Sequence, residues 1–300
     1  MRIASNQYHA TMNTALQTAN VGLTKVMQQM ASGDRVMVAS DDTIATVRLS
    51  RLTREEAALA QYRENIGALK TRLSSNEATL SSVEQDLQAL RDLLVWAADG
   101  ANTSSDLQAM AGSLSSLRDS LFFNFNARNA EGKYLFSGTA TDVATLTDTG
   151  GAPGSRYLQD PAVNTGTQDV AVGDGVAVAA NIALQPLGLD AFLNQLDQTA
   201  DLFQSGSYSA TTASNMLVTV DQVLDDVARQ ISVLGGRQNI VATLDDNHGA
   251  ISLANQQAMI DLGQLDYAEA AVRLNGFTLA VQATQKAYAK VSTLSLFNAL

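Results

Sequence analysis

Apolar residues recur every three or four positions over most of this chain, which is the spacing of helices that pack along one seam. The longest such stretch, residues 59–97, keeps its heptad register without a slip. At 1.5 Å per residue, a helix of this length extends roughly 60 Å. Its seam consists of Leu59, Tyr62, Ile66, Leu69, Leu73, Asn76, Leu80, Val83, Leu87, Leu90, Leu94 and Ala97. We expect Asn76 to be partly exposed; the alternative is a buried asparagine that fixes the helix register.

Similar heptads occupy both ends of the chain. The N-terminal helix is predicted to stop at residues 32–33, and residues 40–42 (SDD) offer caps for the long helix that follows. The threonines, asparagines and glycine of the N-terminal helix lower its helix stability by roughly 4–5 kcal/mol relative to alanine. We therefore expect this helix to need a partner. The candidate assembly residues are the seams of the two terminal helices: Met12, Leu16, Leu23, Val26, Met30, Tyr267, Leu274, Phe277, Val281, Tyr288 and Val291.

A second apolar stripe, Leu265, Val272 and Leu279, runs along the last helix. It indicates either neighbours on more than one side or a wide face toward a core within the domain. Between the ends, residues 107–121, 189–203 and 217–241 are also predicted to be helical. In the last of these, Gly235 and Gly236 predict a bend or a close crossing, because each glycine costs about 1 kcal/mol in a helix.

All three prolines lie between Pro153 and Pro186, inside a stretch rich in glycine, threonine and aspartate. Residues 167–172 and 176–181 read as two strands joined at residues 173–175 (GDG), which predicts a hairpin. The insert is too short to hold a large core of its own. The predicted fold is mainly α: a long antiparallel helical rod or coiled coil with the terminal helices paired, plus a small β-rich insert domain.

The net charge and its distribution along the chain limit the kinds of partner that the protein could bind. The net charge of −11 argues against nucleic acid as a partner, because phosphate binding needs a basic face. Residues 1–33 and 260–300 together carry a net +2, and the remainder carries −13. Weakly charged helical ends are typical of surfaces that meet other protein; the alternative is an N-terminal tail that simply carries few charges.

The sequence shows no pattern of residues that indicates catalysis or metal binding. The chain has no cysteine, and its two histidines, His9 and His248, lack a second ligand at metal-binding spacing. Paired carboxylates at positions 41–42, 55–56, 225–226 and 245–246 are explained as caps and solvated surface. We therefore expect no enzyme activity, no cofactor and no metal. The N-terminus lacks the apolar core of a cleaved secretion signal, and no apolar run is long enough for a membrane span.

Five local motifs then point to a family. Residues 30–36 (MASGDRV) followed by 39–42 (ASDD) resemble the N-terminal signature of bacterial flagellins, with Gln61, Tyr62, Asn65 and Ile66 continuing it. Residues 126–138 (NARNAEGKYLFSG), 235–239 (GGRQN), 266–271 (DYAEAA) and 294–300 (LSLFNAL) resemble the flagellin-like family of hook-associated protein 3, the distal hook–filament junction proteins. Two positions depart from the pattern: Thr43 stands where proline is usual, and Leu265 where an acid is common.

The resemblance implies a structural adaptor of the bacterial flagellum. Copies would form a ring between the proximal hook-associated junction protein and flagellin, after export without a cleaved signal peptide and escort by a flagellar export chaperone. It also implies three domains: a terminal coiled-coil domain of residues 1–43 and 258–300, a helical rod of residues 44–138 and 189–257, and an outer β-rich domain of residues 139–188. The alternatives are a short flagellin that forms the filament itself, and a coiled-coil scaffold unrelated to the flagellum.

Overall fold

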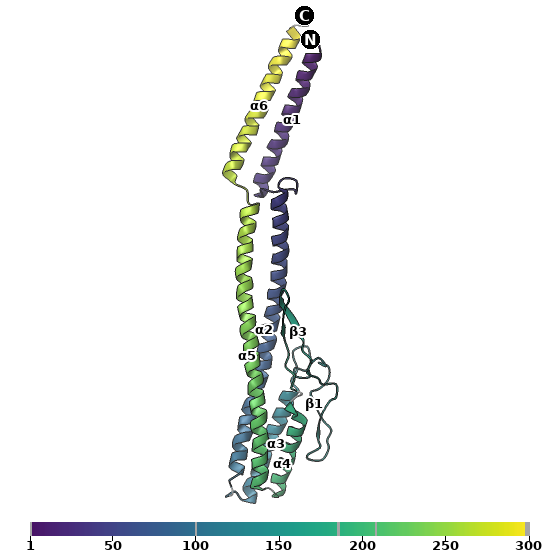
Figure 1. Ribbon diagram of the computed structural model, residues 1–300, viewed down its shortest axis with the longest axis vertical. Coiled ribbons are helices and arrows are strands. Elements are labelled where there is room, and N and C mark those ends of the chain that lie inside the picture. The colour runs from purple at the N-terminus through teal and green to yellow at the C-terminus, as the bar shows by residue number, and fades with distance from the viewer. Residues whose placement is uncertain (1, 100, 185–186, 208, 298–300) are drawn as a thin grey trace. The chain divides into compact units, whose positions relative to one another are not determined.

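The computed structural model describes residues 2–99, 101–184, 187–207 and 209–297, which form six helices and four short strands. The order is α1 (Arg2–Ser32), α2 (Thr43–Ala97), α3 (Ser104–Phe125), β1 (Leu146–Asp148), β2 (Tyr157–Gln159), β3 (Asp169–Gly173), β4 (Val176–Ala179), α4 (Leu189–Ser205), α5 (Ala210–Gly263) and α6 (Tyr267–Phe297). This confirms the predicted fold class, mainly α with paired terminal helices and a small β-rich insert (Figure 1).

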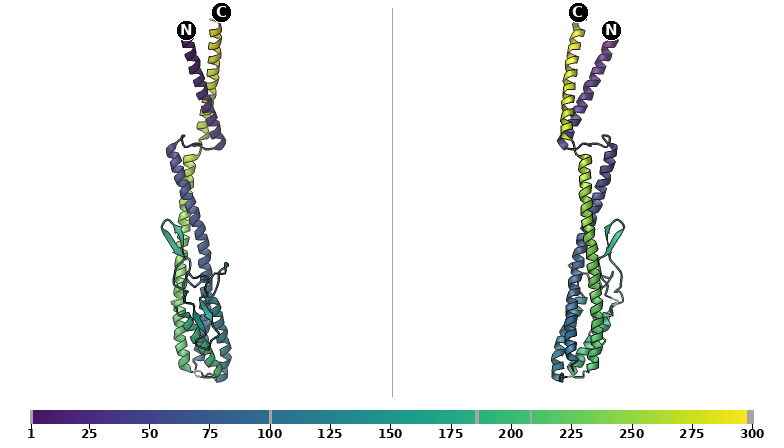
Figure 2. Two further views of the ribbon diagram at one scale, coloured as in Figure 1. Left: turned by 90° about the vertical axis from the view of Figure 1, so that its right-hand side faces the viewer. Right: turned by 60° about the vertical axis from the view of Figure 1, so that its left-hand side comes forward.

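The chain divides into two compact units. Residues 1–58 and 249–300 form the first, here called the terminal unit, and residues 59–248 form the second, the middle unit. In the terminal unit, α1 and α6 run antiparallel side by side and diverge toward the ends of the chain (Figure 2). Val26, Leu265 and Ala270 are buried between them, and Met30, Leu274 and Phe277 pack around these three.

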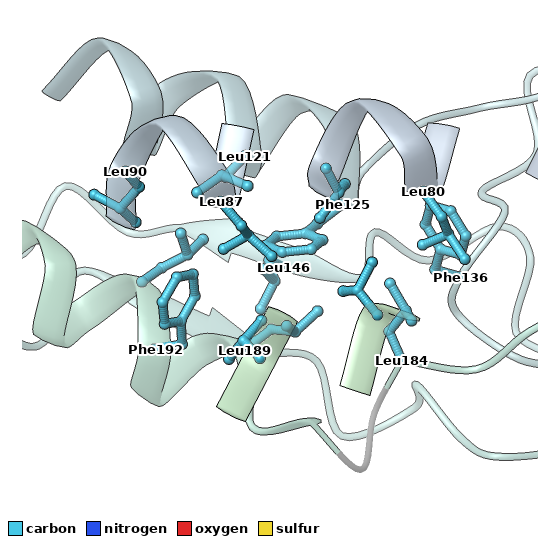
Figure 3. Packing of buried hydrophobic residues seen from close by; sticks show 14 of the residues in the cluster. Leu80, Leu87, Leu90, Leu121, Phe125, Phe136, Leu146, Leu184, Leu189 and Phe192 are labelled. Carbon is cyan, nitrogen blue, oxygen red and sulfur yellow. The ribbon is translucent and has the colours of Figure 1, made fainter. Parts of the chain in front are cut away.

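The middle unit holds the large hydrophobic core. Every leucine, isoleucine and valine of the predicted α2 seam between residues 66 and 94 is at most 2% exposed. Side chains from α3, α4, α5 and the insert close over this row, and Figure 3 shows Leu87 and Phe125 beside Leu146, Leu189 and Phe192. On α5 the buried residues include Val220, Val227, Leu234 and Val241, as the heptad predicted.

Helix α3 begins at a capping box and packs on α4. The Thr103 hydroxyl accepts from the Asp106 backbone amide, and the Asp106 carboxylate accepts from the Thr103 amide at 2.9 Å. Between the two helices, Arg118 of α3 donates to the buried carboxylate of Asp197 on α4. Arg118 also pairs with the exposed Asp119, and Arg156 lies 3.9 Å from Asp197. Among the described residues, however, only the Arg118–Asp197 pair joins α3 to α4 with both side chains buried, so it favours one relative position of these helices.

The β-rich insert consists of two separate antiparallel hairpins, β1–β2 and β3–β4. The β3–β4 hairpin confirms the sequence prediction; its turn at Asp174 and Gly175 uses a positive φ of 67° at the glycine. The β1–β2 hairpin was not predicted from the sequence. Phe136, Tyr157 and Val172 of this region join the core that the helices build, so the insert has no large core of its own.

Polar side chains from α2 and α5 hold the β3–β4 hairpin and the residues after it. Asn65 donates to the Ala171 carbonyl at 2.8 Å, and Nε2 of His248 lies 2.7 Å from the Val172 carbonyl. Asn76 donates to the Ala180 carbonyl at 3.2 Å and is only 1% exposed. The expectation of a partly exposed Asn76 is therefore wrong, because the insert covers this side chain and takes its hydrogen bond.

The close crossing that Gly235 and Gly236 could have indicated is not found. Helix α5 continues through both residues, and across the described part of the chain no atom lies within 4 Å of a Cβ built at either position. The neighbouring seam residues Leu234 and Val241 are fully buried, and the two glycines face outward. Burial of the flanking apolar residues thus keeps the helix intact despite its two glycines.

Among the residues that the structure describes, no helix combines the length and apolar character needed to cross a bilayer.

Candidate assembly surfaces of the terminal unit

The motif at residues 30–42 builds a joint between helices. Gly33, with a φ of 81°, ends α1, and its carbonyl accepts from the Leu265 amide at 2.9 Å. Arg35 then reaches the end of α5, where its Nη2 and Nε donate to the Leu262 carbonyl at 2.9 and 3.2 Å. The Arg35 amide bonds the Gly263 carbonyl at 2.7 Å. These contacts satisfy carbonyls at the end of α5 and tie the α1–α2 loop to the α5–α6 connection.

Two aspartates fix the same loop from its other side. Asp41 accepts a 2.5 Å bond from Nζ of Lys25, which is the main reason why the pKa of this carboxyl lies below its usual value. Asp42 accepts from the Ala45 amide at 2.9 Å and from Arg35 at 3.1 Å, and these bonds lower its pKa in turn. The prediction of a cap at residues 40–42 is confirmed, with Asp42 capping α2.

The predicted seam residues fall into three groups. Val26, Met30, Leu274 and Phe277 pack together between α1 and α6. Met12, Leu16, Leu23 and Val281 are half-buried. Tyr267 and Tyr288 are exposed, at 51% and 41%: the Tyr267 hydroxyl donates to the Met30 carbonyl at 3.4 Å, and the Tyr288 ring stands edge-on to His9. The side chain of Val291 lies outside the described residues.

Apolar side chains also face solvent on this unit. Val272 and Leu279 of the second α6 stripe are 72% and 65% exposed, and only Leu265 of that stripe is buried. The stripe is therefore not a wide face toward a core within the unit. On the other helix, Val21 and Met27 are 63% and 56% exposed. The sequence analysis did not single out these two, because their spacing carries no periodic signal separate from the seam.

The two histidines have structural surroundings. His248 is buried and stacks on the Tyr62 ring in addition to its bond to the insert. Within the described residues, no three histidine, cysteine or acidic side chains group as metal ligands would. The acidic pair at 245–246 is explained by surface ion pairing, since Asp245 contacts Arg63 and Lys70.

Comparisons with known proteins show the class of protein to which this chain is similar. Residues 3–141 match the family described as the bacterial flagellin N-terminal helical region. Flagellar hook-associated protein 3 of Escherichia coli K12 is 25% identical over 316 aligned residues, covering 99% of each chain. A flagellin of Listeria innocua is more distant, at 20% identity over 94% of this chain and 92% of the relative.

Similarity to a solved structure identifies the family within this class of flagellar proteins. A candidate flagellar hook-associated protein from Vibrio parahaemolyticus is 34% identical and superimposes with a TM-score of 0.68, covering 75% of this chain and all of its own. The chain belongs to the family of flagellar hook-associated proteins. This confirms the resemblance inferred from the motifs, and with it the prediction of a structural protein of the flagellar junction.

Proposed function

We propose that this chain is the adaptor that joins the proximal hook-associated junction protein to flagellin, with copies arranged as a ring, and that it has no catalytic activity. The supporting observation is the apolar side chains that stay exposed on the paired terminal helices. Val26, Leu265 and Ala270 are buried where the two helices pack, whereas Val21, Met27, Val272 and Leu279 stay in solvent. Several large apolar side chains exposed on one unit favour contact with other protein chains.

The assembly role is proposed for the terminal helices. Seam residues such as Met12, Leu16, Val281 and Tyr288 are only partly covered by the α1–α6 pair, so neighbouring subunits would complete their burial. A helix that is marginal by itself gains order when such a partner binds. We also propose the three-domain division into residues 1–43 with 258–300, residues 44–138 with 189–257, and residues 139–188.

Export is the second part of the proposal. We infer passage through the flagellar type III apparatus without a cleaved signal peptide, and a chaperone that binds near the C-terminus. The absence of cysteine supports this, because an unfolded chain without thiols forms no cross-link in a narrow channel. Marginal terminal helices would likewise unfold at low cost.

Electron microscopy of a strain that lacks the protein tests the adaptor role. We expect hooks without filaments, with flagellin shed into the medium. Complementation with a chain truncated from residue 260 onward should yield a soluble, folded middle unit that does not enter sheared appendages. Normal filaments in the deletion strain would overturn the proposal.

A short flagellin is the competing function within the same class. Seeding the purified protein with filament fragments separates the two, because a flagellin elongates the fragments and a junction adaptor does not. Elongation in that assay would replace the adaptor by a filament subunit.

A further inference from the structure

The first turns of α2 and the last turns of α5 lie side by side in the terminal unit (Figure 1). A Cβ built at Gly263 would lie 3.8 Å from Cδ2 of Leu49, and the Thr53 hydroxyl lies 4.0 Å from the sulfur of Met259. Residue 49 is therefore level with residue 263, and residue 53 with residue 259, as in an antiparallel pair. Residues 51 and 261 lie midway between these contacts, so they are level with each other as well.

Arg51 and Asp261 occupy these level positions and face outward on opposite sides of the helix pair. Each lies two residues from both contacts on its own helix, which places it about 160° around the helix from them. Both residues are exposed. Among the described residues neither has an ion-pair partner, and Asp261 accepts a hydrogen bond from Gln257 of its own helix at 2.9 Å.

Asp261 belongs to an acidic groove next to the joint of the terminal unit. Five acidic and three basic residues line this groove. The basic residues, Lys25, Arg35 and Arg273, are each paired with a carboxylate. Asp261 and Asp266 have no such partner among the described residues, so the groove, with three positive and five negative charges, has a net charge of −2.

The surface around Arg51 is basic and partly aliphatic. Arg48 and Arg54 are exposed on the same side of α2, and Ile44 and Val47 beside them are 68% and 67% exposed. At 100° per residue, these five positions lie within about one third of the helix circumference. Together with Glu55 they are here called the arginine surface.

Glu55 is exposed within the same third of the helix, so the arginine surface, with three arginines and one glutamate, has a net charge of +2. In the antiparallel pairing of α2 with α5, residue 55 is level with Gln257, which carries no charge. A second copy placed alongside at the same level would therefore set Arg51 opposite Asp261 and Glu55 opposite an amide. The net charges of the arginine surface and the acidic groove are opposite in sign, which favours contact between them.

We propose that the arginine surface of one copy docks against the end of α5 in a second copy, where Arg51 pairs with Asp261. Because these residues are level and face outward on opposite sides, copies join side by side without a shift along the helix axes. The two surfaces differ, so each copy keeps one surface of each kind for its next neighbour, and the contact closes into a ring when the rotation between copies allows it. The inference rests on the proposed ring and names the surfaces that would join it.

Cross-linking in assembled appendages tests the contact, and the absence of native cysteine makes it specific. Ala58 of α2 and Ala254 of α5 are exposed, lie about two turns from Arg51 and Asp261 on the same outer sides, and are level with each other. An Ala58→Cys, Ala254→Cys variant is expressed in place of the wild type, and sheared appendages are treated with a short bismaleimide. We expect a ladder of covalent multimers of this chain, with each single variant remaining monomeric.

The matched control combines Ala58→Cys with Ala283→Cys. Ala283 is also an exposed alanine of the terminal unit, but it lies about four turns beyond the start of α6. This variant should remain monomeric under the same treatment.

Charge exchange at Arg51 and Asp261 provides the second arm. Arg51→Glu in the Ala58→Cys, Ala254→Cys chain should lower the yield of multimers at least tenfold. Adding Asp261→Arg should restore it, which excludes misfolding as the cause. The conservative Arg51→Lys variant should retain most of the yield because it keeps the charge. In chains without cysteine, the same three variants should rank alike in the amount of protein recovered in sheared appendages.

The outcomes separate this contact from the adaptor role. Protein that enters the appendage but gives no more multimer than the control would overturn the contact and leave the adaptor role standing. A product whose mass shows a different flagellar protein attached at residue 58 would also overturn it. If the cysteine variant did not assemble, equal recovery of Arg51→Glu and wild type in sheared appendages would overturn the contact. Wild-type protein absent from appendages would overturn both.

Discussion

Gly22 of α1 and Phe277 of α6 fit together only because residue 22 has no side chain. A Cβ built at Gly22 would lie 2.5 Å from two carbons of the Phe277 ring, closer than unbonded atoms approach. The glycine costs α1 about 1 kcal/mol of helix stability relative to alanine. In return, the aromatic ring packs directly on the helix backbone, which brings the two terminal helices close together.

Gly22→Ala should therefore weaken the terminal pair although it favours the helix. Overpacking typically costs about 1–3 kcal/mol, which exceeds the helix gain of about 1 kcal/mol. Hydrogen exchange of α1 and α6 should show faster exchange in the variant, and Phe277→Leu added to it should restore protection.

Gly112→Ala on α3 is the matched control for this change. Its Cβ would meet no atom within 4 Å, so the same substitution should stabilise that helix by up to about 1 kcal/mol. If Gly22→Ala increased protection as the control does, the close fit with Phe277 would be refuted.

Leu73→Asp should destabilise the middle unit by several kcal/mol. Leu73 is fully buried in the α2 seam, and a carboxylate there would have neither water nor a partner. Thermal unfolding followed by circular dichroism measures the loss. Ala68→Asp, on the exposed side of the same helix, should change the midpoint little. An unchanged midpoint in Leu73→Asp would exclude Leu73 from the core.

Arg35→Ala should loosen the joint of the terminal unit. The change removes two bonds to the Leu262 carbonyl and the ion pair with Asp42, at a cost of about 1–3 kcal/mol. Faster hydrogen exchange at residues 260–265 would report it. Arg48→Ala serves as the control, because Arg48 is exposed and has no ion-pair partner among the described residues. Equal exchange in both variants would show that Arg35 does not hold the joint.

Low pH should destabilise the β1–β2 hairpin, because protonation of Asp148 removes its ion pair with Arg156. Arg156 donates to both carboxylate oxygens at 2.9 and 2.6 Å, and these bonds lower the pKa of Asp148 to about 2. Because the pKa in the folded chain lies below the usual value of 3.8, the ionised carboxylate stabilises the fold above about pH 4. That contribution is lost as the pH falls from about 4 to about 2.

Asp148→Asn should lower the melting temperature at pH 7 and lessen its dependence on pH between about 4 and 2. Melting curves across that range measure both effects. Asp201→Asn, at an exposed position of α4, is the matched control and should leave the curve close to that of the wild type. A wild-type pH dependence in Asp148→Asn would remove this ion pair as the cause.

The sequence predicted those parts of the fold that repeat locally. The unbroken heptad of α2 was enough to identify Leu73 and Leu87 as buried, because burying one face of a helix requires this spacing. The β3–β4 hairpin could likewise be predicted from its turn residues. The β1–β2 strands were missed since each has three residues, too few to show an alternating pattern.

Only part of the candidate assembly surfaces could be predicted from the sequence. The terminal seams were visible as heptads, but the pairing of Gly22 with Phe277 joins residues 255 positions apart, and a glycine gives no sequence signal for the ring that it admits. The role of Arg35 was likewise hidden, because its acceptor at Leu262 is a backbone carbonyl, which every residue has. For the same reason, nothing in the sequence indicated that Asn76 serves the Ala180 carbonyl.

The sequence by itself determined the helical class, the extent of the long helices and the family motifs, since these depend on residue spacing along one chain. Only the tertiary structure decided which apolar residues are covered and which remain in solvent. Val26 and Val272 are both apolar residues at helical positions of terminal helices, yet one is 4% and the other 72% exposed. The difference arises because burial depends on which other segment of the chain packs against a residue, and hydrophobicity alone does not specify that segment.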